Sequence, residues 1–270
     1  MKRKIPFSKL LAAGFLVVLI LFALFPGVFA AYDPLENNLP QKFSGISAEH
    51  LLGTDEYGRD ILSRIIYGTR PSILVGLGTA VLAMVVGVPL GLTAGFCGGF
   101  TDSLIMRLMD ALQSFPSILL AILLMTIFDP SVGSLILIIA IESFPRFTRI
   151  VRASVLSIKK TEFVTAARAF GAGNGYIMFR SILPNCLGNI ITQFCMSMST
   201  AILIEASLSF LGFGIQPPEP AWGSMLSYAK KYLSQSFVYM AAPTMMIFLC
   251  VMSVNSAGDT LRSVFDPKAE

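Results

Sequence analysis

The sequence predicts an all-α membrane protein in which one domain, residues 1–270, crosses the bilayer six times. Hydrophobic residues make up 54% of the chain and charged residues 13%, and the mean hydropathy is +0.73, well above the values of soluble domains. The chain also contains six mostly apolar stretches of about 20 residues, the length that a helix needs to span the hydrocarbon core. These expected spans cover residues 10–31, 72–96, 103–128, 132–152, 186–211 and 236–257.

The first expected span, residues 10–31, follows the basic residues Lys2, Arg3, Lys4 and Lys9 and ends near the small-residue sequence VFAA. This pattern is also typical of a cleaved secretory signal peptide. The apolar run is longer than an ordinary signal core, so we interpret it as an uncleaved first helix.

The distribution of lysine and arginine predicts that both termini are cytoplasmic, because basic residues are retained on the inner side of a membrane. With the N-terminus inside, the inner segments carry 14 of the 20 basic residues and the outer segments carry six. The longest inner loop then covers residues 153–185. The polar segments 32–71 and 212–235 face outside, and neither is long enough to form an independent domain.

The inner loop contains a predicted short helix that begins at Glu162 and ends at Gly171, where glycine suits a left-handed stop. Thr161 is a candidate N-cap, and Glu162 places a negative charge in the first turn, which the helix dipole favours. Asn174 is a candidate cap for a second short helix that runs to Pro184 and leads into the fifth span.

Phe163, Ala167 and Phe170 fall on one face of the first inner helix, at spacings of four and three residues. Two interpretations remain open for this apolar face. It packs on the inner ends of the protein's own helices, or it docks in a groove of a soluble partner, to which the small residues Ala166 and Gly171 give close access.

Two acidic residues lie near span interiors, where a charge is costly unless it is paired or faces water. Glu142 either pairs with Arg146 four residues later or lines a transport pathway. Glu205 lies deeper and is a candidate pathway or gate residue, with an interhelical hydrogen bond as the alternative. Met198 is a further pathway candidate, although packing is the favoured interpretation.

Several kinds of site are not predicted. Cys97, Cys186, Cys195 and Cys250 have no metal-ligand spacing, and His50 is the only histidine, so we expect no metal site. The net charge of +4 comes without a basic-aromatic module, which argues against a nucleic-acid partner. No phosphate-binding loop and no histidine–carboxylate cluster are present, so we expect no ATPase or other enzyme activity in this chain.

The inner loop resembles the EAA loop of ABC-transporter permeases. In that pattern a Glu-Ala-Ala triplet is followed after three residues by glycine and after nine more by Ile-x-Leu-Pro. Here Thr165-Ala166-Ala167 stands for the triplet, Gly171 follows, and Ser181-Ile182-Leu183-Pro184 completes the pattern. Threonine in place of glutamate and serine in place of isoleucine depart from the general pattern, and the threonine resembles the peptide and nickel branch.

Three further segments resemble the second, C-type permease subunit of dipeptide, oligopeptide and nickel importers. They are HLLGTDEYGRDILSRIIYGTRPS (50–72), EASLSFLGFGIQPPEPAWGSML (205–226) and GDTLRSVFDPK (258–268). The resemblance thus extends from about residue 32 to the end of the chain. It implies the fold of a type I ABC importer permease in a bacterial or archaeal cytoplasmic membrane.

The resemblance also implies partners and roles. Half of a translocation pathway would be formed by this chain and half by a second, related permease, with two cytoplasmic subunits that use ATP and Mg²⁺ and an extracytoplasmic substrate-binding protein. The inner helix would couple ATP hydrolysis to transport, and the outer segments would contact the binding protein or simply form structural turns. The implied coupling residues are Glu162, Phe163, Thr165, Ala166, Ala167, Arg168, Phe170, Gly171, Leu183 and Pro184. The implied contacts with the binding protein are Asp55, Arg59, Asp60 and Trp222.

The cargo stays open at this point. Peptides are preferred because residues 205–226 resemble peptide permeases, and nickel or a metal chelate is the alternative. A secondary transporter is a more remote interpretation, since that class predicts several intramembrane ionisable residues or paired interrupted helices and leaves the inner loop unexplained.

Overall fold

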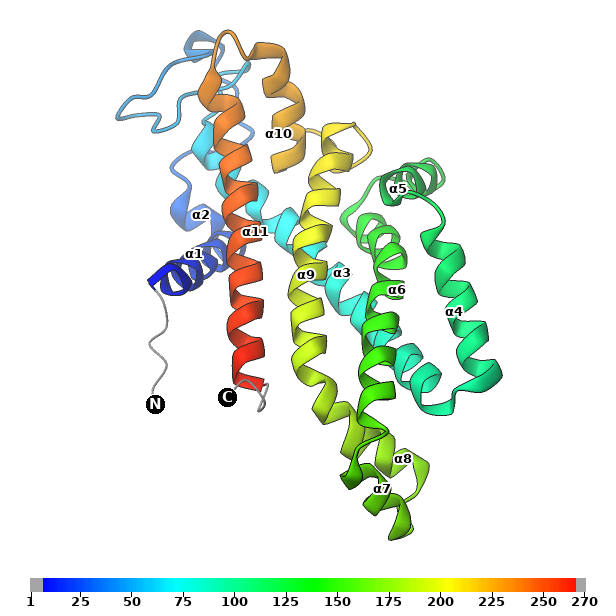
Figure 1. Ribbon diagram of the computed structural model, residues 1–270. Helices are drawn as coiled ribbons and strands as arrows, with labels where there is room; N and C mark the ends of the chain where they lie inside the picture. The colour runs from blue at the N-terminus through cyan, green and yellow to red at the C-terminus, as the bar shows by residue number, and fades with distance from the viewer. Residues whose placement is uncertain (1–6, 266–270) are drawn as a thin grey trace.

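The structure, a computed structural model, describes residues 7–265, and over this range the chain is helical without a β-strand, which confirms the predicted all-α class (Figure 1). Lys2, Arg3, Lys4 and Lys268, which entered the charge count, lie outside the described residues. The α-helices are α1 (Phe7–Leu24), α2 (Pro26–Phe29), α3 (Ile61–Cys97), α4 (Gly99–Gln113), α5 (Ser117–Met125), α6 (Val132–Ile158), α7 (Glu162–Ala169), α8 (Asn174–Tyr176), α9 (Leu183–Phe210), α10 (Trp222–Ala229) and α11 (Phe237–Phe265). Short 3₁₀ or π turns are η1 (Leu39–Gln41), η2 (Ile177–Ile182) and η3 (Lys230–Tyr232).

Three helices among the described residues are long and apolar enough to cross a membrane: α3, the continuous helix Asn174–Phe210 that includes α9, and α11 up to Ser263. The bent pair α4 and α5 adds a fourth if the two form one span. Helix α1 is apolar but shorter, and α6 has 27 residues but carries three arginines in its second half. By length and composition the structure therefore supports three or four crossings, and the count of six remains a prediction.

The structure corrects two of the expected spans, because each is two helices rather than one. Residues 103–128 divide into α4 and α5, which are bent by 79° relative to each other. Residues 10–31 divide into α1 and α2 at Phe25. A proline follows each break, Pro26 and Pro116, and proline disfavours the helical conformation of the residue before it.

The longest element, α3, runs through the length of the molecule and packs most extensively against α6. Helix α9 packs against α3 and α11, and α1 lies against α11. In Figure 1, α3, α6 and α11 run toward the end that holds α7, whereas α9 runs away from it. We call this the α7 end, and we call the opposite end, with residues 32–60 and α10, the lobe end.

A stripe of glycines in α3 allows its close approach to α6. A Cβ atom at Gly87 would lie 2.5 Å from the Cβ of Phe147, and one at Gly95 would lie 2.8 Å from the Cβ of Val155. At Gly91 it would lie 2.6 Å from a carbonyl oxygen of α6. Small residues four apart are typical of tightly packed membrane helices, because they let two backbones meet.

We predict that Gly91→Val separates α3 from α6 and destabilises the protein by about 1–3 kcal/mol, the usual cost of overpacking. Thermal unfolding of the purified protein in detergent measures this change. Gly14→Val is the control, because nothing lies within 4 Å of a Cβ at that position of α1. Equal stability of the two variants would contradict close packing at Gly91.

Candidate functional site

Helix α7 forms where the sequence predicts it, between Thr161 and Gly171. Gly171 has φ of +82°, and the amide of Ala172 donates to the carbonyl of Ala167 at 3.0 Å, so the helix ends in the expected left-handed turn. Thr161 occupies the N-cap position with extended backbone, but its hydroxyl donates backward to the carbonyl of Ile158 at 2.6 Å. The predicted side-chain cap is therefore absent.

One apolar face of α7 holds the helix on the rest of the chain. Val164 is 1% exposed and belongs to the same buried cluster as Val155 of α6 and Ile177 and Ile182 of η2. Ala167 is half-buried and packs against this cluster. The position of α7 is thus fixed by the ends of α6 and α9.

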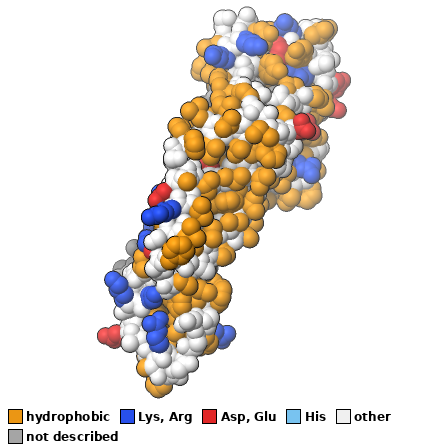
Figure 2. All heavy atoms as spheres, turned by 90° about the vertical axis from the view of Figure 1, so that its right-hand side faces the viewer, with side chains coloured by type: hydrophobic (Ala, Val, Ile, Leu, Met, Phe, Trp, Pro, Cys, Tyr) orange, Lys and Arg blue, Asp and Glu red, His pale blue; other side chains and the backbone are white. Residues whose placement is uncertain are grey.

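The two phenylalanines of α7 point away from that cluster. Phe163 is 48% exposed and Phe170 is 92% exposed, so the chain's own helices do not cover them. Tyr176 and Phe179 are also exposed nearby along the chain, which gives the α7 end four uncovered aromatic side chains. Figure 2 shows apolar and basic side chains mixed at this lower end of the molecule.

The remaining residues of the predicted coupling set lie at the same end. Leu183 is half-buried and joins the cluster under α7. The others are exposed, namely Glu162, Thr165, Ala166, Arg168, Gly171 and Pro184. The structure therefore brings the whole set together around one short helix.

The pathway candidate Glu205 is completely buried and joins α9 to α3. Its carboxylate accepts from the hydroxyl of Ser72 at 3.2 Å and from that of Ser209 at 2.8 Å. Ser209 in turn accepts from the amide of Ile215 at 3.1 Å, in the loop after α9. This geometry matches the interhelical hydrogen bond named as the alternative for Glu205.

The other two pathway candidates also make contacts within the chain. Glu142 pairs with Nη2 of Arg146 at 2.8 Å and accepts from the hydroxyl of Ser117 in α5 at 2.7 Å. The predicted pair between residues four apart is confirmed. Met198 packs partly buried against the cluster that α9 shares with α1 and α11.

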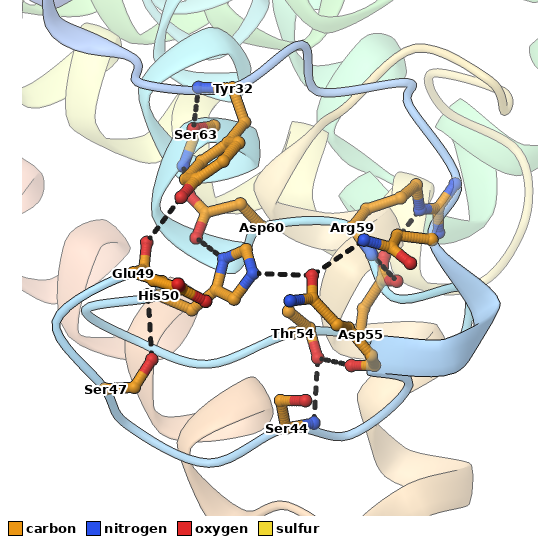
Figure 3. A network of polar contacts seen from close by, with 12 residues as sticks. Tyr32, Ser44, Ser47, Glu49, His50, Thr54, Asp55, Arg59, Asp60 and Ser63 are labelled. Carbon is orange, nitrogen blue, oxygen red and sulfur yellow. Dashed lines mark hydrogen bonds and ion pairs between the residues drawn. The ribbon is translucent and has the colours of Figure 1, made fainter.

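At the lobe end, the acidic and basic residues form a buried network (Figure 3). Asp55 is wholly buried and accepts from Nε of Arg59 at 2.6 Å and from the amides of Tyr57 and Arg59. Asp60 caps α3 by accepting from the amide of Ser63 at 2.8 Å, and it also contacts Nδ1 of His50 at 3.0 Å. The ion pairs therefore hold a structural turn, and its charges point inward.

Trp222, another implied contact with the binding protein, is likewise buried. Its side chain is 0% exposed, and its Nε1 donates to the carbonyl of Ile65 in α3 at 3.1 Å. Because Trp222 and the predicted lobe contacts are buried, they shape the lobe end, and other side chains form its surface. Exposed apolar side chains there include Leu35, Leu39, Ile46 and Leu51.

A groove between α6 and α9, near Arg262 of α11, was not predicted from the sequence. Its volume is about 470 Å³, and it is lined by Ser154, Ser157, Asn189, Thr192, Gln193 and others. Gln193 is 5% exposed and lines this groove. The polar residues at 189, 192 and 193 provide the sequence signal, at helical spacing inside an expected span.

A family model described as the inner membrane component of binding-protein-dependent transport systems matches residues 87–270, more than half of the chain. The chain belongs to this family. Two relatives in it are transport permease proteins named DppC, both 42% identical to this chain. The first is the di/tripeptide permease of Pseudomonas aeruginosa, and its match covers 94% of this chain and 86% of the relative's length. The second is the dipeptide permease of Alkalihalophilus pseudofirmus, and its match covers 97% of this chain and 86% of the relative's length.

A third relative, the glutathione transport permease GsiD of Pectobacterium atrosepticum, is 40% identical over 95% of this chain and 86% of its own. These matches confirm the resemblance to the C-type permeases of the family. A solved structure of the inward-facing MetNI methionine ABC transporter has a TM-score of 0.66 at 17% identity, over 76% of this chain and 97% of that one. The permease fold of a type I importer is therefore shared.

We predict that Asp55→Ala unfolds the lobe end, because it removes the wholly buried carboxylate that pairs with both Arg59 and Arg64, at a cost of about 3–5 kcal/mol. Limited proteolysis after residue 32 and thermal unfolding in detergent measure the effect. Glu36→Ala is the control, since Glu36 is exposed in the same segment. A lobe as resistant in Asp55→Ala as in the control would show that the network is dispensable.

Proposed function

We propose that this chain is one of two transmembrane subunits of an ATP-driven, binding-protein-dependent importer of di- or oligopeptides. The observation that carries the transporter role is the uncovered aromatic face of α7 on a family permease fold. The peptide cargo rests on relatives that are 39–42% identical over almost the whole chain and whose names specify dipeptides, other peptides or glutathione. Those names give no support to nickel.

Helix α7 is the element through which the ATPases act on the membrane. Phe163 and Phe170 are too exposed to stabilise this chain alone, and their burial in a groove of a soluble subunit would gain apolar contact. Val164 holds the opposite face on α6 and η2, so a force on α7 is applied directly to the helix bundle. ATP and Mg²⁺ are used by the two partner subunits, and this chain binds no cofactor.

The assembly has the arrangement expected of the family. The single membrane domain spans six times with both termini and the α7 end in the cytoplasm, in a bacterial or archaeal membrane. A second permease completes the pathway, and an extracytoplasmic binding protein delivers cargo at the lobe end. The buried Asp55, Arg59, Asp60 and Trp222 position the lobe, and the exposed Leu39, Ile46 and Leu51 offer the docking contacts.

The groove between α6 and α9 is this chain's share of the peptide path on the cytoplasmic half. An amide side chain such as that of Gln193 is costly to expose to lipid and suits the lining of a water-filled passage. Amide and hydroxyl groups bind a peptide backbone without selecting its side chains, as a general peptide importer requires. By contrast, Glu205 accepts a hydrogen bond from Ser72 and so links α9 to α3. Its role as a gate remains a prediction, and its complete burial argues against that role.

The assembled transporter in proteoliposomes tests this function. We expect ATP-dependent uptake of labelled dipeptides that requires the binding protein, and no uptake of Ni²⁺ under the same conditions. Uptake of Ni²⁺ but not of peptides would overturn the cargo. Uptake without any ATP-binding subunit would overturn the transporter class. In this assay Gln193→Leu is expected to lower peptide uptake, whereas Thr244→Leu on the far α9–α11 groove is not.

We predict that Phe170→Ala weakens docking of the ATP-binding subunit by about 2 kcal/mol, or roughly 30-fold, the effect of losing an interface hot spot. Co-purification and peptide-stimulated ATPase activity measure the loss. Phe237→Ala is the matched control, because Phe237 is 72% exposed at the lobe end.

Gly171→Val is expected to abolish the same ATPase stimulation while the chain still inserts into the membrane. Its φ of +82° disfavours a β-branched residue, and no atom lies within 4 Å of a Cβ there, so backbone strain alone accounts for the effect. Normal coupling in this variant would contradict the role assigned to the turn after α7.

A further inference from the structure

Two arginines of α6 are paired with two aspartates of α4 near the α7 end. Arg152 binds Asp102 through both carboxylate oxygens, at 2.5 Å from Nε and 2.6 Å from Nη2. One turn earlier, Nη2 of Arg149 lies 2.6 Å from Oδ1 of Asp110. Bidentate arginine–carboxylate pairs fix orientation as well as distance.

The same series continues toward the lobe end. Arg146, three residues before Arg149, pairs with Glu142 at 2.8 Å, and the hydroxyl of Ser117 at the start of α5 donates to the same Glu142 oxygen at 2.7 Å. Arg149 and Arg152 thus connect α6 with α4, and Glu142, which Arg146 holds within α6, connects α6 with the start of α5. We call these contacts the α4–α6 ion-pair ladder.

Helix α4 is held by few buried side chains. Met109 is the one residue of α4 that is buried. The helix is bounded by a change of direction at each end: Gly98 and Gly99 have φ of 69° and 55°, and the chain bends by 79° before α5. A helix between two such bends can change its tilt as a unit, and the ladder sets its tilt relative to α6.

The other end of α6 leads to α7 within three residues. Lys159 donates from Nζ to the carbonyl of Phe96 at 2.5 Å, which ties the end of α6 to the end of α3. Val164 and Val155 share one buried cluster, so α7 and the last turns of α6 are packed together. A displacement of α7 therefore reaches Arg152 and Arg149 through a continuous packed helix.

We propose that the α4–α6 ion-pair ladder carries the motion of α7 to the bent α4–α5 pair, with Asp102, Asp110, Arg149 and Arg152 as positioning residues for transport. This inference rests on the proposed function. The pairs are 18–66% exposed at their carboxylates, so as mere surface ties they would contribute little to stability. Their directional geometry instead links the tilt of α4 to that of α6. A transporter that alternates between two states requires links of this kind between its helices.

The test uses the complete transporter in proteoliposomes, with peptide uptake and ATP hydrolysis measured on the same preparation. Asp102→Arg alone and Arg152→Asp alone are expected to lower the number of peptides transported per ATP by about tenfold, a typical coupling effect. The double variant Asp102→Arg with Arg152→Asp restores opposite charges and is expected to recover much of this ratio. Asp129→Asn, an exposed aspartate in the α5–α6 turn, is the control.

The ratio separates coupling from folding, because loss of folded transporter lowers uptake and hydrolysis together. If a single charge reversal prevents assembly, Arg152→Lys, which keeps the charge but not the bidentate geometry, is expected to lower the ratio. The proposed role of the ladder would be wrong if the number of peptides transported per ATP were unchanged in Arg152→Lys and in every assembled single variant. It would also be wrong if the double variant did not recover this number. Absence of peptide uptake by the unmodified transporter would instead overturn the proposed function.

Discussion

The close contact of α3 with α6 is the constraint on which the rest of the structure depends. The glycines at 87, 91 and 95 bring the two backbones together, and this contact fixes the line along which α6 runs. Because α6 continues almost directly into α7 and carries the arginines of the ladder, its placement sets both the position of the exposed phenylalanines of α7 and the contacts of α4. Removal of the contact would leave these features without a common support.

Burial separates the charged residues of this chain into two kinds. At the lobe end, Asp55, Arg59 and Asp60 point inward and stabilise a strand-free segment that has little apolar core of its own. Along α6, Arg149 and Arg152 remain partly exposed and contact carboxylates on α4. Loss of a buried pair is strongly destabilising, whereas an exposed pair contributes little to stability. The buried pairs therefore stabilise the shape of the lobe end, and the exposed pairs can link the motion of α6 to that of α4.

The sequence predicted the helical class, the position of α7 and the turn at Gly171, because apolar runs and a glycine stop are local signals. The division of residues 103–128 into α4 and α5 was not predicted. Pro116 is a signal for this break, but the apolar length of the segment favoured one continuous span. The family resemblance also implied that Trp222 contacts the binding protein, whereas its indole is buried and donates to the carbonyl of Ile65. The ladder and the groove depend on which faces of α4, α6 and α9 meet, and that information is not local.

The central claim is that Phe163 and Phe170 of α7 contact an ATP-binding subunit. The most direct measurement places a photo-crosslinking phenylalanine analogue at position 170, and at position 237 as the control, in cells that express the complete transporter. We expect a covalent adduct between this chain and an ATP-binding subunit from position 170 and none from position 237. An adduct with lipid alone, or no adduct, from position 170 would contradict the account.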